Sequence, residues 1–400
     1  MSWEKLSLKD ICCDIQTGPF GSQLHRSDYA DFGIPVIMPK DIVNGHISTN
    51  TIALVEPNHV ERLKRHVVKT NDIIFARRGD VGRCAFVTVE ENGWICGTGC
   101  IRATVNRKVA NPKFVFYQLQ KPETIGWIEK HAIGSTMLNL NTSIIGDVPV
   151  ELPALETQNR MVDMIDNYDD LIQNNQKQIK LLEEAAQRLY KEWFVDLRFP
   201  GYENVKIVDG VPEGWRIGTL KDVAVFSGQN ERKTNRDKYK YYLPIDCLPK
   251  KSLSYISFQN NELAESSLVS FDENDIIFGA MRPYFHKVVV ARDKGLTRST
   301  CFVVNSIEKT FWSFLVMLLF SEDTVKYATQ ISVGTTMPYV RWNDFINMPV
   351  LIPCKEISYK FDKVIKPIID KTKLLSTSII SLSKSRDMLL PRLMSGEVEV

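Results

Sequence analysis

The sequence contains one long pattern twice, and this repeat constrains the fold more than any other feature. Four short motifs of the first half return in the same order in the second half. They pair as Trp3-x4-Leu8-Lys9-Asp10 with Trp215-x4-Leu220-Lys221-Asp222, Asn71-Asp72-Ile73-Ile74-Phe75 with Asn274-Asp275-Ile276-Ile277-Phe278, Gly134-Ser135-Thr136-Met137 with Gly334-Thr335-Thr336-Met337, and Pro149-Val150-x2-Pro153 with Pro349-Val350-x2-Pro353. An ordered set of matches about 200 residues apart predicts two copies of one fold.

Each half has the same internal organisation. A mixed segment contains short apolar runs, such as Ile73–Ala76 and Val288–Ala291, interrupted by Gly and Pro, and this pattern is typical of strands joined by turns. A long helical pattern follows each mixed segment. We therefore predict an α/β (α+β) fold with two similar globular domains, 1–153 and 201–353, and two helical spacers, 154–200 and 354–400.

The two helical patterns have apolar residues at alternating steps of four and three, in the same register. The seam runs from 161 to 193 in the first helix and from 361 to 393 in the second. Its principal apolar residues are Met161, Ile165, Ile172, Ile179, Leu182 and Leu189 in the first helix, and Phe361, Ile365, Leu375, Ile379, Leu382 and Leu389 in the second. This period of about 3.5 residues is that of a coiled coil. We predict helices at 158–195 and 356–393, each about 50 Å long at ~1.5 Å per residue, that pair antiparallel and separate the two domains.

Several residues depart from the helical seam. Asn175, Thr372 and Arg386 are polar at seam positions, where such residues fix register or partner choice. Pro367 should start or kink the second helix. A buried core hairpin or a homodimer zipper are the other structures that this pattern fits.

The net charge is only +2, so binding to nucleic acid has to be argued from local clusters. Arg and Asn form bidentate bonds to guanine and adenine, while Lys, Ser and Thr mostly hold phosphates. Such residues follow the repeated Asn-Asp-Ile-Ile-Phe and Gly-Ser/Thr-Thr motifs, and a basic segment spans 229–240. The candidate DNA-binding residues are Arg77, Arg78, Arg83, Ser135, Thr136 and Asn139 in the first half, and Arg232, Lys233, Arg282, Tyr284, Lys287, Thr335, Thr336, Tyr339 and Arg341 in the second. A solvated surface is the alternative for any one of them.

No catalytic or metal-binding motif occurs in the sequence. A GxxxxGK[ST] phosphate loop, HExxH and GxSxG are absent, and the eight cysteines form no CxxC pair. We therefore predict a non-enzyme without a metal. Charged residues among the first ten exclude the apolar core of a signal peptide, and the apolar run Phe311–Phe320 is too short to span a bilayer, so we expect a cytoplasmic location.

Three further motifs resemble the specificity (S) subunit of type I restriction–modification systems, and the resemblance covers essentially the whole chain. They are Thr17-Gly18-Pro19-Phe20-Gly21-Ser22 near the start, Trp193-Phe194-Val195-Asp196-x2-Phe199-Pro200-Gly201 followed by Pro212-Glu213-Gly214-Trp215 in the centre, and Leu389-Leu390-Pro391-Arg392-Leu393-x2-Gly396-Glu397 at the end.

This resemblance implies two target-recognition domains on an antiparallel helical spacer, which read a bipartite sequence in double-stranded DNA. It also implies two methyltransferase (M) subunits that bring S-adenosylmethionine and modify adenine N6. Restriction (R) subunits that use ATP and Mg are implied as well, and no cofactor is expected in this subunit. A non-enzymatic coiled-coil adaptor that binds proteins, or a standalone DNA-binding regulator, are the alternatives.

Overall fold

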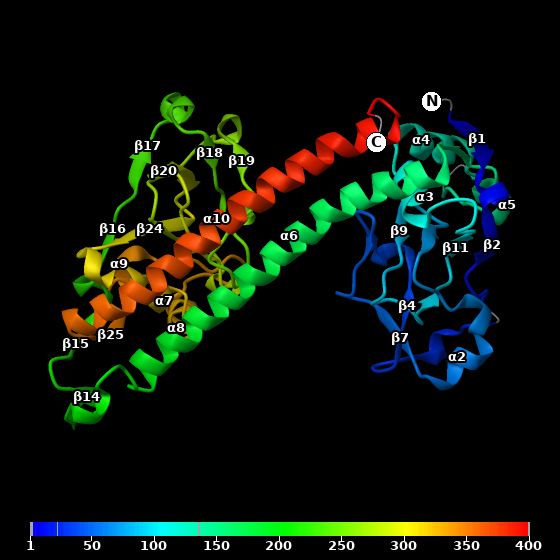
Figure 1. The fold of residues 1–400 in the computed structure, drawn as a ribbon. Coiled ribbons are helices and arrows are strands. Elements are labelled where there is room, and N and C mark those ends of the chain that lie inside the picture. The colour runs from blue at the N-terminus through cyan, green and yellow to red at the C-terminus, as the bar shows by residue number, and fades with distance from the viewer. Residues whose placement is uncertain (1–2, 22, 135–136, 399–400) are drawn as a thin grey trace. The chain divides into compact units, whose positions relative to one another are not determined.

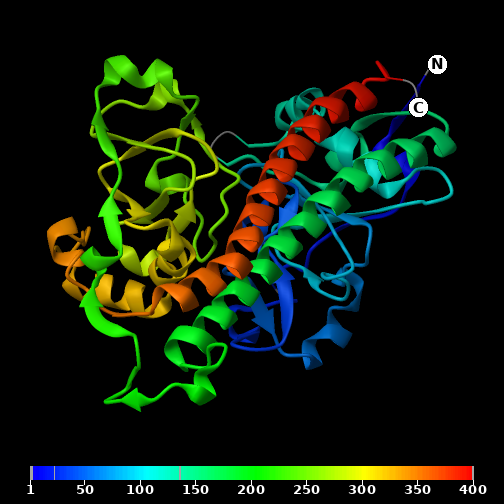
Figure 2. The ribbon, with the colours of Figure 1, turned by 60° about the vertical axis from the view of Figure 1, so that its left-hand side comes forward.

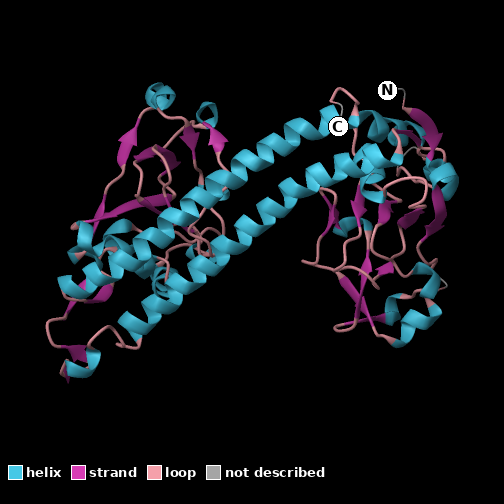
Figure 3. Cartoon of the chain, viewed as in Figure 1, coloured by secondary structure: helices cyan, strands magenta, loops and turns pink. Residues whose placement is uncertain are grey.

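The computed structural model describes residues 3–21, 23–134 and 137–398, which divide into two compact units. Unit 1 consists of Met1–Tyr168 and Ser385–Val400, and unit 2 of Asp169–Lys384. Both units contain helices and strands (Figure 3). Each unit thus contains one globular segment and part of both long helices. The division into four segments at 153, 200 and 353 stays a prediction.

Unit 1 is built on one antiparallel sheet and a second, smaller sheet. The main sheet has the strand order β2 (Cys12–Thr17), β11 (Cys100–Val105), β8 (Asp72–Ala76), β9 (Cys84–Phe86), and the second β10 (Ile95–Cys96), β4 (Ile34–Ile37), β7 (Ala53–Val55), β3 (Tyr29–Ala30). A hairpin joins β5 (Ile42–Val43) to β6 (His46–Ile47), and β1 (Glu4–Ser7) pairs with β12 (Pro149–Leu152). The short helices are α1 (Leu8–Ile11), α2 (Asn58–Arg62), α3 (Pro112–Leu119), α4 (Pro122–His131) and α5 (Thr142–Gly146).

Unit 2 repeats this plan. Its main sheet has the order β16 (Ala224–Phe226), β24 (Cys301–Ser306), β21 (Ile276–Gly279), β22 (Val288–Val290), and its second sheet β17 (Gln229–Glu231), β20 (Leu268–Phe271), β23 (Gly295–Arg298), β18 (Tyr241–Tyr242), β19 (Gln259–Asn260). A hairpin joins β13 (Ile207–Val208) to β14 (Val211–Pro212), and β15 (Arg216–Thr219) pairs with β25 (Pro349–Ile352). The short helices are α7 (Trp312–Leu319), α8 (Glu322–Ile331) and α9 (Trp342–Phe345).

The repeated Asn-Asp-Ile-Ile-Phe motif forms an interior strand in each main sheet. All residues of β8 and of β21 are buried, which explains why these strands are apolar on both faces instead of alternating. In each unit, moreover, an early strand pairs with the last strand before the long helix, as β1 does with β12 and β15 with β25. The prediction of two α/β domains of one fold is confirmed.

The two long helices are α6 (Leu155–Tyr190), which ends in a π-helical turn at Lys191–Val195, and α10 (Lys355–Met394). Figure 1 shows them side by side. In unit 2, the rings of Trp193 and Phe361 lie 5.5 Å apart, while Asn175 Nδ2 donates a hydrogen bond to Ser378 Oγ at 3.2 Å. Since the later α6 residue contacts the earlier α10 residue, the helices run antiparallel, as predicted.

The predicted seam residues lie in three apolar clusters. In unit 1, Met161, Ile165 and Leu389 belong to the cluster that also contains Leu393. In unit 2, a small cluster contains Ile172, Ile179, Leu182, Leu375, Ile379 and Leu382. The largest cluster of unit 2 contains Leu189, Phe361 and Ile365. All twelve predicted apolar seam residues therefore belong to an apolar cluster, as a period near 3.5 requires.

Pro367 lies inside α10 and does not begin it, so the expectation that it starts the helix was wrong. Packing of the neighbouring turns, with Ile365 and Ile369 almost fully buried, holds the helix together where the proline removes one backbone donor. Figure 2 shows that α10 curves along its length. Thr372, a polar seam residue, donates its hydroxyl to the carbonyl of Ile369 at 2.8 Å and so needs no partner across the seam.

In unit 2, polar side chains of both long helices bind the globular segment. Glu183 of α6 is buried and accepts hydrogen bonds from Ser252 Oγ at 3.1 Å and from the Leu253 N–H at 2.9 Å. Lys373 of α10 donates to Asn274 Oδ1 at 2.6 Å. These contacts attach the loop that precedes β21, and the loop around Ser252, to the middle of the helical pair.

Each unit begins beside the end of a long helix. In unit 1, Gly396 follows α10 with a φ of +74°, and a Cβ on it would lie 3.1 Å from the indole of Trp3. In unit 2, the ring of Trp215 lies 4.9 Å from that of Phe199, which follows α6. The two repeated tryptophans therefore occupy equivalent places.

Candidate nucleic-acid interface

In unit 1, the candidate residues that follow β8 lie next to those that precede α5. Arg77 donates its Nε–H to the carbonyl of Leu140 at 3.2 Å, and its guanidinium lies 5.8 Å from the ring centre of Phe20. Arg78 is exposed and forms an antiparallel bridge with Asn139. The structure thus brings Arg77, Arg78 and Asn139 together. Ser135 and Thr136 lie outside the described residues.

The loop that carries Asn139 is closed on itself. The backbone of Ile133 exchanges two hydrogen bonds with that of Asn139, each of 2.9 Å. The side-chain Oδ1 of Asn139 is buried and has no hydrogen-bond partner among the described residues. An unsatisfied amide oxygen costs stability in a closed fold, so its retention beside two arginines favours a polar ligand here.

Arg83, in contrast, makes its contacts within unit 1. Its Nη1 donates to the carbonyl of Ile42 at 3.0 Å, and its Nε lies 3.0 Å from the carboxylate of Asp80. These contacts tie the turn after β8 to the β5–β6 hairpin. Because its Nη1 is hydrogen bonded within unit 1 and its guanidinium is paired with Asp80, Arg83 is a weaker candidate for DNA contact than Arg78.

In unit 2, the loop after β21 lies against the loop that precedes α9. The N–H of Arg282 donates to the carbonyl of Pro338 at 2.7 Å, and its Nη2 donates to that of Thr336 at 3.3 Å. Tyr339 bridges to Met281 and to Val333. The structure therefore brings Arg282, Thr336 and Tyr339 together, with Thr335 exposed in the same loop and Arg341 exposed just beyond it.

The remaining unit 2 candidates after β21 differ in exposure. Tyr284 lies on the turn Pro283–Phe285 and is exposed. Lys287 points its Nζ to the carbonyl of Ile245 at 2.7 Å, so this ammonium is held within the domain. Arg282 and His286, on either side of the turn, have φ near +50°, a conformation that residues other than Gly rarely adopt. Such strain is concentrated at binding sites and turns.

The two loops are equivalent in backbone but not residue for residue. Leu140 N–H donates to the carbonyl of Arg77, and Val340 N–H donates to that of Ala280. Arg77 therefore corresponds to Ala280, and Arg282 corresponds to a glycine, Gly79, whose N–H donates to Leu138 as that of Arg282 does to Pro338. The same frame thus presents different side chains in the two units.

The basic segment of unit 2 belongs to the second sheet. Arg232 is exposed directly after β17, and Lys233 is paired with Glu265 at 2.8 Å. Strand register aligns Glu231, Leu268 and Arg298 across three strands. The hydroxyl of Tyr339 donates to the carbonyl of Ser299 at 3.3 Å. Arg232 and the Tyr339 loop are therefore linked through the exposed turn that follows β23.

Arg298, in that turn, is an exposed cation that the sequence reasoning missed. Backbone hydrogen bonds from Arg77 to Gly99 and from Ala280 to Thr300 align Gly97-Thr98-Gly99 with Arg298-Ser299-Thr300. Aligning those two tripeptides would have found it. At Gly97, a Cβ would lie 2.6 Å from the carbonyl of Ile37, so unit 1 cannot carry a side chain where unit 2 carries arginine.

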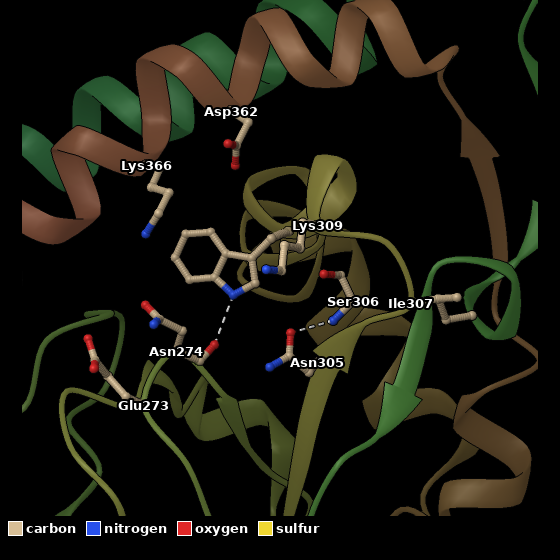
Figure 4. A pocket seen from close by; sticks show the side chains of 9 residues that line it. Glu273, Asn274, Asn305, Ser306, Ile307, Lys309, Asp362 and Lys366 are labelled. Carbon is tan, nitrogen blue, oxygen red and sulfur yellow. Dashed lines mark hydrogen bonds between the residues drawn. The ribbon is translucent and has the colours of Figure 1, made fainter.

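The cavity drawn in Figure 4 lies elsewhere in unit 2 and has a volume of about 660 Å³. Trp312 donates its indole N–H to the carbonyl of Asn274 at 2.8 Å, and Lys366 Nζ lies 4.9 Å from the centre of its ring. Glu273 and Asp362 add negative charge. None of the candidate DNA-binding residues lines this cavity, so the candidate interface is a set of loops and not a pocket.

The described residues contain no group of three His, Cys, Asp or Glu side chains placed to hold a metal ion. All eight cysteines are free thiols, and burial raises the pKa of Cys84 and of Cys96 to about 12. In the described part of the chain, no helix combines the length and the apolar character needed to cross a membrane.

Two copies of one α/β domain contact an antiparallel helical pair and carry arginine-bearing loops at equivalent places, so the chain has two similar candidate interfaces for a nucleic acid. The comparisons agree. Residues 1–184 match the family model of the type I restriction modification DNA specificity domain. The resemblance to type I specificity subunits is confirmed: the chain is similar to these proteins, and DNA target recognition is favoured over a protein-binding adaptor.

Curated relatives match over nearly the full length. The type I restriction enzyme MjaIX specificity subunit of Methanocaldococcus jannaschii is 25% identical, with 100% of this chain and 94% of the relative covered. The HindI specificity subunit of Haemophilus influenzae is 24% identical, with 99% of each chain covered. A crystal structure of a type I S subunit from M. genitalium has a TM-score of 0.61 at 14% identity, and 98% of this chain and 96% of that one are covered. This structural likeness supports the fold.

Proposed function

We propose that this chain is the sequence-specific DNA-recognition subunit of a type I restriction–modification system and that it reads a bipartite target. The observation that carries the proposal is the pair of equivalent loops. Unit 1 presents Arg78 and Asn139, and unit 2 presents Arg282 and Tyr339, on one repeated backbone frame. One scaffold with two sets of side chains is suited to recognise two different half-sites.

The proposed partners are double-stranded DNA, two methyltransferase (M) subunits and restriction (R) subunits. The M subunits supply S-adenosylmethionine and methylate adenine N6, and the R subunits use ATP and Mg. In this proposal, the chain itself holds no cofactor, performs no chemistry and acts in the cytoplasm. Its twelve seam residues in α6 and α10 form the helical spacer on which both recognition domains and the partner subunits are positioned.

A domain exchange tests the recognition proposal. The chain is expressed with its M subunit, and methylated positions are mapped across a genome. Residues 1–153 are then replaced by the first domain of another family member. We expect only one half of the methylated sequence to change, because only the loops of unit 1 have been exchanged. A change in both halves, or in neither, would contradict the two-reader proposal.

A binding measurement tests the absence of chemistry. Calorimetry of the purified chain with S-adenosylmethionine should give no heat of binding, and the M subunit should bind the same cofactor under the same conditions. Sequence-specific, salt-dependent DNA binding should require both subunits. Specific binding by the chain alone would instead favour a standalone DNA-binding regulator.

A further inference from the structure

Each unit exposes two apolar side chains on the small loop beside its arginines. Ile133 and Met137 are 61% and 63% exposed in unit 1, and Val333 and Met337 are 56% and 57% exposed in unit 2. A single exposed apolar residue is common on protein surfaces. Two within five residues, repeated at the same loop positions of both units, require a shared explanation.

The loops that carry these residues are held firmly at their base. Val333 and Tyr339 exchange backbone hydrogen bonds of 2.9 and 3.0 Å, as Ile133 and Asn139 do in unit 1. The glycine that follows the first apolar residue has a φ of +120° in unit 1 and +110° in unit 2, and a Cβ on Gly134 would lie 2.5 Å from the carbonyl of Met137. The closed base and the left-handed glycine accompany an exposed methionine in both units.

The surroundings of the tip are cationic. Arg282 donates to the carbonyl of Thr336, next to Met337, and Arg341 is exposed on the same loop. In unit 1, Arg78 bridges to Asn139, two residues beyond Met137. An apolar tip surrounded by arginines fits a polyanion with an apolar interior. Duplex DNA has both properties, because its phosphates lie outside and its stacked bases lie inside.

Comparison of the two units distinguishes side chains that differ, and so can recognise different bases, from side chains that both units share. Arg78 corresponds to Met281 and Asn139 to Tyr339, so the side chains proposed to contact bases differ between the units. The apolar pair is retained instead. Under the proposed function, the event common to both half-sites is the extrusion of an adenine from the stack for methylation by the partner subunit. Unstacking costs a few kcal/mol, and inserted apolar side chains such as Met and Ile offset it in other DNA complexes.

We propose that Met137 with Ile133, and Met337 with Val333, are wedges that enter the base stack at the two half-sites and stabilise the duplex with the target adenine turned out. They act as positioning residues for the methyltransferase and do not read the sequence. This inference rests on the proposed function and adds a step to it.

The test uses the chain in complex with its M subunits, on a duplex that carries the target mapped with the natural chain. Met337→Ala and Met137→Ala are compared with the natural chain in single-turnover methylation of each half-site. We expect each variant to slow methylation of its own half-site about tenfold or more, which corresponds to an increase of at least ~1.4 kcal/mol in the activation free energy. An abasic nucleotide opposite the target adenine should restore the rate to within about threefold, because that duplex is already unstacked.

A second readout follows unstacking directly. With 2-aminopurine in place of the target adenine, the natural complex should raise the fluorescence, and Met337→Ala should not. Met337→Leu, which keeps the apolar volume, should behave like the natural chain. Equal slowing on matched and abasic duplexes would overturn the wedge. So would a loss of rate caused by replacing thymine with uracil in the natural complex, since that result identifies a methyl contact instead.

Matched controls are available in both units. Val89 in unit 1 is 77% exposed and Ile217 in unit 2 is 71% exposed, and both lie in other elements. Val89→Ala and Ile217→Ala should leave both rates unchanged. If the natural complex methylates no bipartite target, the proposed function itself fails. If it does and Met337→Ala methylates at the natural rate, only the wedge fails.

Discussion

The buried carboxyl of Glu183 gives the chain a specific dependence of stability on pH. Burial raises its pKa from 4.5 to about 7, although the hydrogen bonds from Ser252 and Leu253 act in the opposite direction. The folded chain therefore binds this proton more tightly than the unfolded chain. The associated stability is present in full below about pH 4.5 and is lost as the pH rises through about 7.

The size of the effect follows from the same two values. One pKa unit corresponds to about 1.36 kcal/mol, so ionising Glu183 in the folded chain costs up to about 3 kcal/mol at pH 8. Glu183→Gln keeps an acceptor for Ser252 and Leu253 and removes the charge. We expect it to unfold like the natural chain at pH 5, and to be more stable by about 1–3 kcal/mol at pH 8.

Urea unfolding followed by tryptophan fluorescence at the two pH values measures this difference. Glu184→Gln is the control, because the neighbouring carboxyl is only half-buried and pairs with Arg188 at 3.6 Å. That variant should change stability by less than about 0.5 kcal/mol at either pH. If Glu183→Gln and the natural chain keep the same difference at pH 5 and pH 8, the carboxyl is not protonated on folding and the reasoning is wrong.

Three further outcomes can be measured. Phe361→Ala removes a fully buried ring and should destabilise the chain by about 3–5 kcal/mol in urea unfolding, whereas Tyr359→Ala, at an exposed position, should cost less than about 0.5 kcal/mol. Arg78→Ala should weaken DNA binding by the complex and reduce the slope of log affinity against log salt by about one, and an unchanged slope would place Arg78 away from the phosphates. In thiol titration of the native chain, exposed Cys13 should react rapidly while buried Cys84 stays unreactive, and Cys13→Ser should abolish the fast phase.

The seam of the long helices could be predicted because it is a local property. Residues such as Ile172 and Ile179 repeat at the helical period, and one helix is enough to show it. The repeat motifs located the loops after β8 and β21 for the same reason. Pro367 does not start the helix, one of its two expected effects, because packing of its neighbours, which the period does not reveal, holds the helix together there.

The rest depends on contacts between distant segments. Glu183 lies next to a seam residue and looks like any solvated helix charge, and its burial is set by a loop about 70 residues later. Arg298 lies near the Tyr339 loop because the tyrosine hydroxyl donates to the carbonyl of the next residue, Ser299. Arg83 and Lys287 have the residue types expected of DNA contacts, yet each donates a hydrogen bond to a backbone carbonyl of its own unit. Residue type predicts what a side chain can bind, and tertiary structure decides what it does bind.

Trp3 beside Gly396, and Trp215 beside Phe199, have a consequence for how freely the chain can be rearranged. Each globular segment begins and ends at neighbouring places, because one of its early strands pairs with its last strand. The described chain therefore has two equivalent junctions, a covalent one near residues 199–215 in unit 2 and an open one between residues 396 and 3 in unit 1. Opening the chain near residues 199–215 and linking residue 396 to residue 3 would give a circular permutant with the same contacts. A segment with adjacent ends is also a cassette that recombination can exchange without disturbing its neighbours.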